Sequence, residues 1–473
     1  MIRDWSFCDC FGNKQSVDND DDDGIHPVLL VTGMGGSIIN SKDKRTGCEI
    51  RVWVRVLLAN WELRKKALSI YNPKTGYTES LDKNCEIVVP DNDYGLYAID
   101  ILDPSPIVRC LKVEEMYQFH NMINMLVECG YKKGATLFGY GYDFRQSNRL
   151  EFPKPAHDNV ALNFSALDCF SFSRIDEGME GLKAKLENAY KASGGRKVNL
   201  ISHSMGGLLV SCFLSLYHDL FEKYVNKWIC IACPFQGAPC INEILLTGFQ
   251  FLEGFENYFF ISRWTMHQLL VECPSIYEML PNPEFKWKKE PQIQVWRKQS
   301  QNNEASVKLE TYGPKESITV FEEALKYNKL NYSGKSIPLP FNKSILKWAS
   351  GTREILNKAQ LPASVKFYNI FGASFESPFD VRYGTKASPI EDMPQICNTM
   401  PQYSFVNGDG TVPLESAKGD WFSATERVGV RATHRGLLSD ETVFQLIQQW
   451  LGVEPQKSSR RAKTSKVVDA FSK

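Results

Sequence analysis

Short runs of apolar residues recur along the chain and alternate with stretches of helical spacing. The run His26-Pro-Val-Leu-Leu-Val-Thr32 is continuous and apolar, as in a strand that a parallel sheet buries on both faces. The predicted strands lie at 26–32, 135–139, 197–202, 228–233 and 365–371, and the predicted helices at 114–130, 175–192, 205–214 and 440–451. Strands that alternate with helices indicate an α/β fold with a mostly parallel central sheet.

Two long stretches interrupt this alternation. Residues 41–105 carry turn signals without sustained periodicity, and we interpret them as an excursion from the sheet. Residues 240–360 are rich in Phe, Trp, Tyr and Lys and predict an inserted cap domain. The expected parts are an acidic N-terminal segment (1–24), a first part of the core (25–239), the cap (240–360), a second part of the core (361–455) and a basic C-terminal tail (456–473).

The composition is that of a globular enzyme. Of the 473 residues, 43% are hydrophobic and 12% aromatic, which excludes disorder for most of the chain. Lys and Arg together number 55, as do Asp and Glu, so the net charge is zero and excludes nucleic acid as a global partner. Runs of about 18 apolar residues are absent, so we expect no transmembrane segment, and a lipid substrate has to be met from the water side.

The cysteines point to a reducing compartment. They number thirteen and have no repeated spacing, which favours neither a zinc site nor a full disulfide framework. The tight pair Cys230-x-x-Cys233 lies in an apolar run that predicts a buried strand. With no signal-peptide pattern before the first core strand, we expect a cytoplasmic enzyme with transient membrane association. Cys8 and Cys10 can accept reversible acylation and the basic tail can touch anionic lipid, with solvated termini as the alternative.

The motif with chemical content is Ser202-His-Ser-Met-Gly206, between a predicted strand and a predicted helix. A serine on such a sharp turn projects its hydroxyl into a cleft, where the helix amino terminus faces a developing oxyanion. We therefore predict that Ser204 is a catalytic nucleophile. Ser202 replaces the usual first glycine of G-x-S-x-G but keeps a small side chain at this junction. The alternative is that Ser204 only caps a core helix whose Gly206-Gly207 pair packs on the sheet. His203 is assigned a structural role, because the turn fixes it.

The partners of such a serine follow it along the chain in the order Asp, His. His434 is the one histidine beyond residue 380 and precedes the last predicted helix, so we predict that it is the base. Asp409 lies between two glycines at a strand end and is the predicted orienting carboxylate, with Asp420 and Asp440 as competitors. All three side chains are expected to meet at the carboxyl edge of one parallel sheet. A surface histidine and a solvated turn aspartate are the alternative interpretations.

Two backbone amides are predicted to stabilise the oxyanion. The amide of Met205 follows the nucleophile and is the expected first donor. Gly33-Met-Gly-Gly36 offers the second through the amide of Met34, because glycines let the backbone approach a substrate closely. A phosphate-binding loop is the rival interpretation, but no G-K-[ST] follows.

With these residues, the chain resembles the lecithin:cholesterol acyltransferase family, and in particular its plant-type, signal-less branch, over about residues 25–455. The motifs that carry the resemblance are Val31-Thr-Gly-Met-Gly-Gly36, Gly141-Tyr-Asp-Phe-Arg145, Ser202-His-Ser-Met-Gly-Gly207, Pro234-Phe-Gln-Gly-Ala238, Asn407-Gly-Asp-Gly-Thr-Val-Pro413 and Thr433-His434. The resemblance implies an α/β-hydrolase fold and a triad of Ser204, Asp409 and His434, with the Met34 and Met205 amides as oxyanion donors. Family members cleave a fatty acyl chain from a glycerophospholipid, and some pass it to a sterol or another alcohol, without a metal or other cofactor.

The resemblance also implies a lid segment at about 48–85. Cys48 and Cys85 bracket this segment, which secreted members of the family close with a disulfide. Trp53 and Trp61 belong to an apolar cluster within it and are candidates for contact with the acyl chains of a substrate, with a buried lid core as the alternative. The aromatic segment 249–260 can dock on a bilayer in the same way, although aromatics of a cap pack more often in a core.

The leading hypothesis is a phospholipase A-type acyl hydrolase acting on phospholipid at a membrane surface. Ser204 attacks the ester, His434 shuttles the proton, and water resolves the acyl-enzyme. One alternative is an acyltransferase that passes the acyl group to a sterol or another lipid alcohol. The other is a catalytically silent lipid-binding protein of the same fold.

Overall fold

A six-stranded sheet forms the centre of the protein. The structure is a computed structural model, and it describes residues 24–55, 63–111, 116–149, 178–248, 262–301 and 304–455. The strand order is β17-β14-β9-β8-β1-β7, and every neighbouring pair is parallel. These strands are β1 (Val28–Val31), β7 (Leu137–Tyr140), β8 (Val198–His203), β9 (Val225–Ile231), β14 (Lys366–Gly372) and β17 (Ala424–Val430). The predicted α/β-hydrolase class with its mostly parallel sheet is confirmed.

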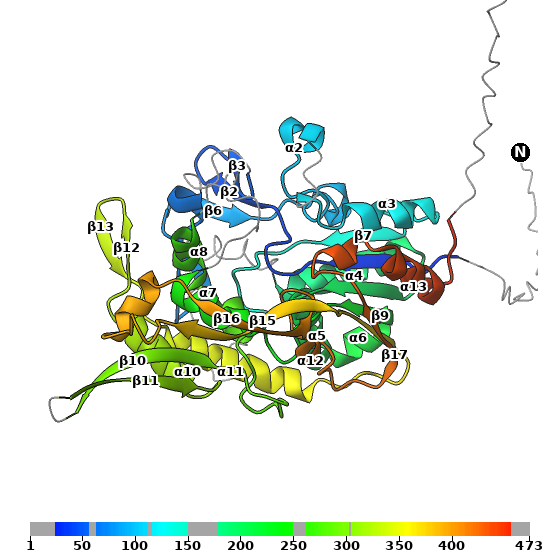
Figure 1. Ribbon diagram of the computed structural model, residues 1–473. Helices are drawn as coiled ribbons and strands as arrows, with labels where there is room; N and C mark the ends of the chain where they lie inside the picture. The colour runs from blue at the N-terminus through cyan, green and yellow to red at the C-terminus, as the bar shows by residue number, and fades with distance from the viewer. Residues whose placement is uncertain are drawn as a thin grey trace, which may run out of the picture.

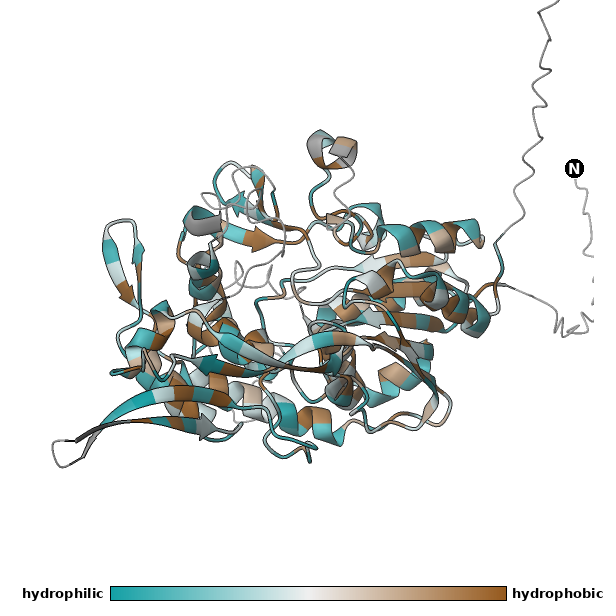
Figure 2. Cartoon of the chain, viewed as in Figure 1, coloured by the Kyte–Doolittle hydropathy of each residue, from teal (hydrophilic) through white to brown (hydrophobic). Residues whose placement is uncertain are grey.

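Helices cover both faces of this sheet (Figure 1). One face carries α3 (His120–Glu128) and α13 (Glu441–Leu451), and the other carries α4 (Met179–Ala192), α5 (Gly206–Leu216) and α6 (His218–Tyr224). Side chains alternate along each strand, so Leu30 packs with the first pair of helices and Leu29 with the other three. Burial on both faces explains the continuous apolar runs in the sequence, and Figure 2 shows hydrophobic colour along these strands.

Helix α3 begins later than its apolar spacing predicted. Met116 and Phe119 are buried as that spacing required, but they precede the helix. The backbone N–H of Gln118 donates to the carbonyl of Asp100 (2.9 Å), and that of Phe119 donates to the carbonyl of Ile99 (2.9 Å). This pairing with a distant segment takes the place of the first helical turn, which periodicity alone does not reveal.

A second sheet has the order β11-β10-β15-β16. Its strands are β10 (Ile293–Gln301), β11 (Glu304–Tyr312), β15 (Phe375–Tyr383) and β16 (Gln402–Gly408). The pairs β10–β11 and β15–β16 are antiparallel, whereas β10 and β15 are parallel. The sheet therefore combines strands from the stretch predicted as the cap with strands from the stretch predicted as the second part of the core. Such pairing between distant segments leaves no local signature in the sequence.

Shorter elements surround the two sheets. Those of the predicted excursion are β2 (Ile39–Asp43), β3 (Glu49–Trp53), η1 (Leu63–Ala67), β4 (Ser69–Asn72), β5 (Tyr77–Ser80), β6 (Cys85–Val88) and η2 (Asp93–Gly95). They form a three-stranded sheet β3-β2-β6 and a hairpin β4-β5. The other elements are α2 (Pro106–Leu111), α7 (Cys240–Thr247), α8 (Arg263–Leu270), α9 (Pro274–Glu278), α10 (Ser317–Ala324), β12 (Lys329–Tyr332), β13 (Lys335–Pro338), α11 (Lys343–Lys358), η5 (Met393–Asn398), α12 (Leu414–Ala417) and η6 (Gly436–Leu438).

Several of the sequence predictions fall outside the described residues. They concern the N-terminal segment before Gly24 with Cys8 and Cys10, Trp61, the aromatic segment 249–260, and the basic tail from residue 456.

Candidate active site

Ser204 occupies the turn between β8 and α5 with a φ of 54°. A positive φ is uncommon for a residue with a side chain and marks the sharp strand-to-helix turn expected of a nucleophile elbow. The N–H of Ser204 donates to the carbonyl of Ile231 at 2.8 Å, which fixes the turn to the end of the neighbouring strand β9. The elbow predicted from the sequence is therefore present.

Small residues let the elbow pack tightly. A Cβ on Gly206 would overlap a carbonyl oxygen just after β1, and a Cβ on Gly33 would lie 2.7 Å from the Cβ of Ser204. Ser202 stands where the usual motif has its first glycine, and its buried hydroxyl accepts a hydrogen bond from Nε1 of Trp228 at 2.8 Å. The departure from the usual motif is accommodated because this hydroxyl has a partner.

His434 lies in the loop between β17 and η6, and its ring bridges the other two predicted residues. Its Nε2 is 2.9 Å from Oγ of Ser204, and its Nδ1 is 2.7 Å from Oδ2 of Asp409. A carboxylate at Nδ1 favours the tautomer that carries its proton there, which leaves Nε2 to accept the proton of the serine hydroxyl. The structure thus brings Ser204, His434 and Asp409 into one hydrogen-bonded line.

Asp409 is buried, and backbone groups hold its second carboxylate oxygen. Oδ1 accepts hydrogen bonds from the N–H groups of Thr411 (2.9 Å) and Val412 (2.7 Å). Asp409 follows β16 of the second sheet, whereas Ser204 and His434 follow strands of the central sheet. Asp409 meets the central sheet at the end of β14, where Gly372 leaves room because a Cβ there would overlap the Cβ of Asp409.

The two competing aspartates are engaged elsewhere. The carboxylate of Asp420 pairs with the guanidinium of Arg427 at 2.6 Å. Asp440 caps α13 and accepts hydrogen bonds from two N–H groups of its first turn at 2.8 and 3.1 Å. Asp409 is therefore the carboxylate that contacts His434.

The two predicted oxyanion donors lie on segments that touch each other. A turn closed by the N–H of Gly36 and the carbonyl of Gly33 (3.2 Å) contains Met34, and Met205 directly precedes α5. A Cβ on Gly33 would lie 3.2 Å from the amide nitrogen of Met205, so the glycine loop lies against the elbow. Of the described residues, none accepts a hydrogen bond from either the Met34 or the Met205 amide, which leaves both for a developing oxyanion.

His203 is buried directly beside these residues. Its Nε2 donates to the backbone carbonyl of His434 at 2.9 Å, and the two ring centroids are 4.9 Å apart. Burial, with a smaller effect of the neighbouring His434, lowers the pKa of His203 well below its ordinary value. The sequence analysis assigned His203 a structural role. Its position next to Ser204 was the one feature of the sequence that pointed to the site, and nothing in the sequence indicated a contact with the backbone of His434.

Trp53 links the predicted lid to the glycine loop. It ends β3, is buried, and donates from Nε1 to the carbonyl of Gly35 at 2.8 Å. Its ring centroid is 5.3 Å from that of Phe144. This packing is that of a buried lid core, and the contact of Trp53 with a substrate acyl chain stays a prediction. Cys48 is exposed, Cys85 is buried, and both are free thiols.

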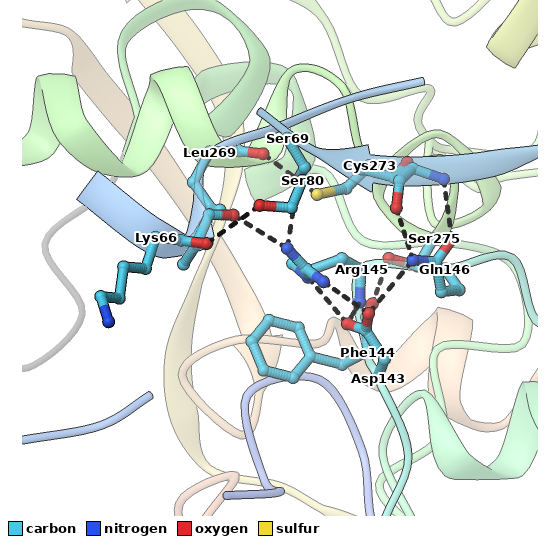
Figure 3. A network of polar contacts seen from close by, with 12 residues as sticks. Lys66, Ser69, Ser80, Asp143, Phe144, Arg145, Gln146, Leu269, Cys273 and Ser275 are labelled. Atoms are coloured by element: carbon cyan, nitrogen blue, oxygen red, sulfur yellow. Dashed lines mark hydrogen bonds and ion pairs between the residues drawn. The ribbon is translucent and has the colours of Figure 1, made fainter. Parts of the chain in front are cut away.

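Arg145 ties the β4–β5 hairpin of the predicted lid to the rest of the protein (Figure 3). Its guanidinium contacts the carboxylate of Asp143 at 2.6 and 2.8 Å and donates to Oγ of Ser69 in β4 at 3.2 Å and to the carbonyl of Ala67, at the end of η1, at 2.8 Å. Gln146 donates to the carbonyl of Thr78 and accepts from its N–H, both at 2.9 Å. All of these polar groups are buried, so each depends on its partner. This part of the predicted lid is therefore anchored to the core.

Glu272 forms a second anchor for the same hairpin. Its buried carboxylate accepts the N–H of Tyr71 in β4 at 2.9 Å and the side-chain amide of Asn342 at 3.2 Å. Burial raises the pKa of Glu272 to about 7. The sequence carried no signal for this carboxylate.

The tight cysteine pair of the sequence lies behind the elbow. Cys230 and Cys233 are buried free thiols, and a Cβ on Gly207 would lie 2.8 and 2.6 Å from their sulfur atoms. The pair thus fills the space against which α5 packs. Within the described ranges, no three His, Cys, Asp or Glu side chains gather as a metal-binding group. Nor does any helix in those ranges combine the length and the apolar character needed to cross a membrane.

Known proteins similar to this chain include lipid-acting enzymes. A family model described as lecithin:cholesterol acyltransferase matches residues 59–436. The chain is 60% identical over 469 residues to Phospholipase A(1) LCAT3 of Arabidopsis thaliana, covering 98% of this chain and 99% of that protein. It is 47% identical to Lecithin-cholesterol acyltransferase-like 4 of the same plant, over 91% of this chain and 76% of the relative. The Lysosomal phospholipase A and acyltransferase of Bos taurus is 25% identical, over 47% of this chain and 50% of that protein.

Proposed function

The chain belongs to the lecithin:cholesterol acyltransferase family, and from this premise we propose that it is a serine phospholipase A that releases a fatty acyl chain from glycerophospholipids. The observation that carries the proposal is the hydrogen-bonded line from Asp409 through His434 to Ser204. A relative that is 60% identical along nearly its whole length is named a phospholipase A(1), which supports the ester at the sn-1 position as the preferred site.

In the first half of the reaction, Oγ of Ser204 attacks the ester carbonyl carbon while Nε2 of His434 takes the hydroxyl proton. The carboxylate of Asp409 orients the ring and stabilises the imidazolium that forms. The Met34 and Met205 amides donate to the oxyanion of the tetrahedral intermediate. The ester C–O bond then breaks, and His434 returns the proton to the departing lysophospholipid alkoxide.

In the second half, a water molecule attacks the acyl-enzyme. His434 takes a proton from this water, the bond between the acyl carbon and Oγ breaks, and the proton returns to Ser204. If a lipid alcohol takes the place of water, the same steps give an acyltransferase. The relative named both phospholipase A and acyltransferase supports this second activity, and a sterol is one candidate acceptor.

The expected substrate is phospholipid at a membrane surface, which the enzyme meets from the water side. A cytoplasmic location with transient membrane contact is part of the proposal. The ten cysteines within the described ranges are all free thiols, which supports a reducing compartment. Imaging of a fluorescent fusion in plant cells tests this location, and accumulation in a secretory compartment would contradict it.

The test of function gives the purified protein phosphatidylcholine vesicles with and without sterol. The vesicles carry different acyl chains at sn-1 and sn-2, and free fatty acid, lysophospholipid and steryl ester are followed by mass spectrometry. We expect free fatty acid from the sn-1 position and its matching lysophospholipid.

Steryl ester as the main product would make the acyltransferase the principal activity. A protein that binds the vesicles but releases no acyl chain would be the catalytically silent lipid-binding protein. The Ser204→Ala variant is the matched control, and undiminished release by this variant would contradict the proposal.

A further inference from the structure

We propose that His203 is a positioning residue, which holds the peptide group of His434 so that the imidazole of the base stays in line with Ser204. The inference rests on the proposed function, because it assigns a role within the same triad. It goes beyond the triad because it assigns a function to His203, the residue that directly precedes the nucleophile.

Both backbone polar groups of His434, its N–H and its carbonyl, have a hydrogen-bond partner. Its N–H donates to the carbonyl of Asp409 at 2.8 Å, and its carbonyl accepts from Nε2 of His203 at 2.9 Å. The backbone that carries the base is therefore held from two sides, on one side by the orienting aspartate and on the other by the elbow. Neither contact uses the ring atoms that take part in the proton transfer.

His203 is suited to donate a fixed hydrogen bond to the backbone of His434 and not to transfer protons. A backbone carbonyl accepts only, so Nε2 of His203 carries the ring proton. Nδ1 is buried and has no hydrogen-bond partner among the described residues, and burial lowers the pKa of this imidazole well below its ordinary value. His203 is thus a neutral donor next to His434, and it adds no positive charge when His434 becomes an imidazolium. Phe119 supports the ring edge-on, with centroids 6.5 Å apart.

The geometry couples the two reacting residues. His203 ends β8 and Ser204 follows it directly, so whatever fixes the elbow also fixes the donor that holds His434. Without this donor, the backbone N–H of His434 keeps its hydrogen bond to Asp409, but the backbone carbonyl of His434 loses its contact with the elbow. A displacement of about 1 Å between reacting groups lowers the rate on the order of a hundred-fold, so a small shift of the loop that carries His434 has a measurable effect.

Three substitutions separate the hydrogen bond from the packing. His203→Gln places an amide N–H the same number of bonds from Cα as Nε2 of histidine and can donate to the same carbonyl. His203→Asn has the same amide group but is too short to reach it. His203→Phe keeps the ring volume and removes the donor.

The readouts are kcat and KM for acyl release from phosphatidylcholine vesicles and the rate at which a fluorophosphonate labels Ser204. We expect kcat and the labelling rate to fall about ten- to a hundred-fold in the Phe and Asn variants with KM unchanged, and to recover in the Gln variant. His267→Phe is the matched control. It makes the same substitution at another buried histidine, whose Nε2 accepts a hydrogen bond from the side-chain amide of Asn328, and its labelling rate should equal that of the wild type.

The thermal unfolding temperature of each variant is measured alongside. Equal labelling rates in all three folded His203 variants would overturn the inference, as would a Gln variant as slow as the Phe variant. If the Phe variant does not fold, the comparison of Gln with Asn decides. A wild type that is labelled at Ser204 but releases no acyl chain would refute the phospholipase proposal while the labelling rates still test His203. A wild type that is not labelled would overturn both.

Discussion

The backbone N–H of His434 donates to the backbone carbonyl of Asp409 at 2.8 Å, while Nδ1 of the same histidine lies 2.7 Å from the carboxylate of the same aspartate. The two residues are therefore joined through both main chain and side chain, although 25 positions separate them in sequence. This double link connects the loop after β17 to the turn after β16. It fixes the position of the imidazole relative to the carboxylate.

Asp409→Asn tests the orienting role of the carboxylate. The amide oxygen of asparagine can still accept the N–H groups of Thr411 and Val412, so its NH₂ group faces Nδ1 of His434. That contact favours the tautomer with the proton on Nε2, which can no longer accept the serine proton. We expect kcat for acyl release to fall by roughly 10⁴-fold. Asp420→Asn removes a carboxylate that pairs with Arg427 instead, and it should keep the wild-type kcat. A larger loss in the Asp420 variant would contradict the assignment.

Gly372→Ala tests the approach of Asp409 to the end of β14. The new methyl group would overlap the Cβ of Asp409 and lie 2.7 Å from the carbonyl oxygen of Ala432, so the aspartate must move. We expect a loss of about a hundred-fold in kcat, measured with a soluble ester substrate. Gly313→Ala is the control, since its methyl group would meet only the ends of the Glu290 and Glu316 side chains. Equal activity of both variants would show that the triad tolerates this displacement.

Arg145→Met tests the anchor of the β4–β5 hairpin. Burial alone would raise the pKa of Asp143, but the adjacent Arg145 guanidinium holds it below its ordinary value. Removal of Arg145 leaves a buried carboxylate unpaired, and we expect the free energy of unfolding to fall by about 3–5 kcal/mol. Hydrogen exchange at the hairpin amides should accelerate as well. The double variant with Asp143→Asn should recover part of the loss, and a single variant as stable as the wild type would contradict this account.

Glu272→Gln tests the pH dependence of the second anchor. The pKa of Glu272 is raised from 4.5 to about 7, so between these pH values the folded state holds a proton that the unfolded state has lost. The free energy of unfolding must therefore decrease as pH rises through this interval and become level above pH 7. Relative to the glutamine variant, the wild type should lose about 3 kcal/mol over the interval, with a slope of about 1.4 kcal/mol per pH unit. Denaturant unfolding at several pH values checks this, and parallel curves for the two proteins would contradict it.

The elbow and the central strands could be predicted from the sequence because their signals are local. A buried strand that is followed directly by a serine and a buried helix is typical of a nucleophile elbow in a parallel α/β sheet. His434 can be predicted because no other histidine follows residue 380. These predictions needed no knowledge of which strand pairs with which.

Features that depend on pairing between distant segments could not be predicted in the same way. Asp409 stands at a strand end as expected, but its strand joins the second sheet, a choice set by contacts with β15. Arg145 belongs to a motif that the sequence analysis singled out, but the sequence did not show that Arg145 or Glu272 is buried, since their burial depends on contacts with the β4–β5 hairpin. The contact of His203 with His434 likewise depends on how the loop after β17, which is distant in sequence, packs against the elbow.

The most direct test of the central claim is the identity of the atom that carries the acyl group during turnover. The enzyme is mixed with phosphatidylcholine vesicles, quenched in acid within milliseconds, digested, and analysed by peptide mass spectrometry. We predict that the peptide containing Ser204 gains the mass of one fatty acyl group, with fragment ions that place it on Ser204. Acyl release at the full rate with no modification of that peptide, or with the acyl group on another residue, would contradict the account.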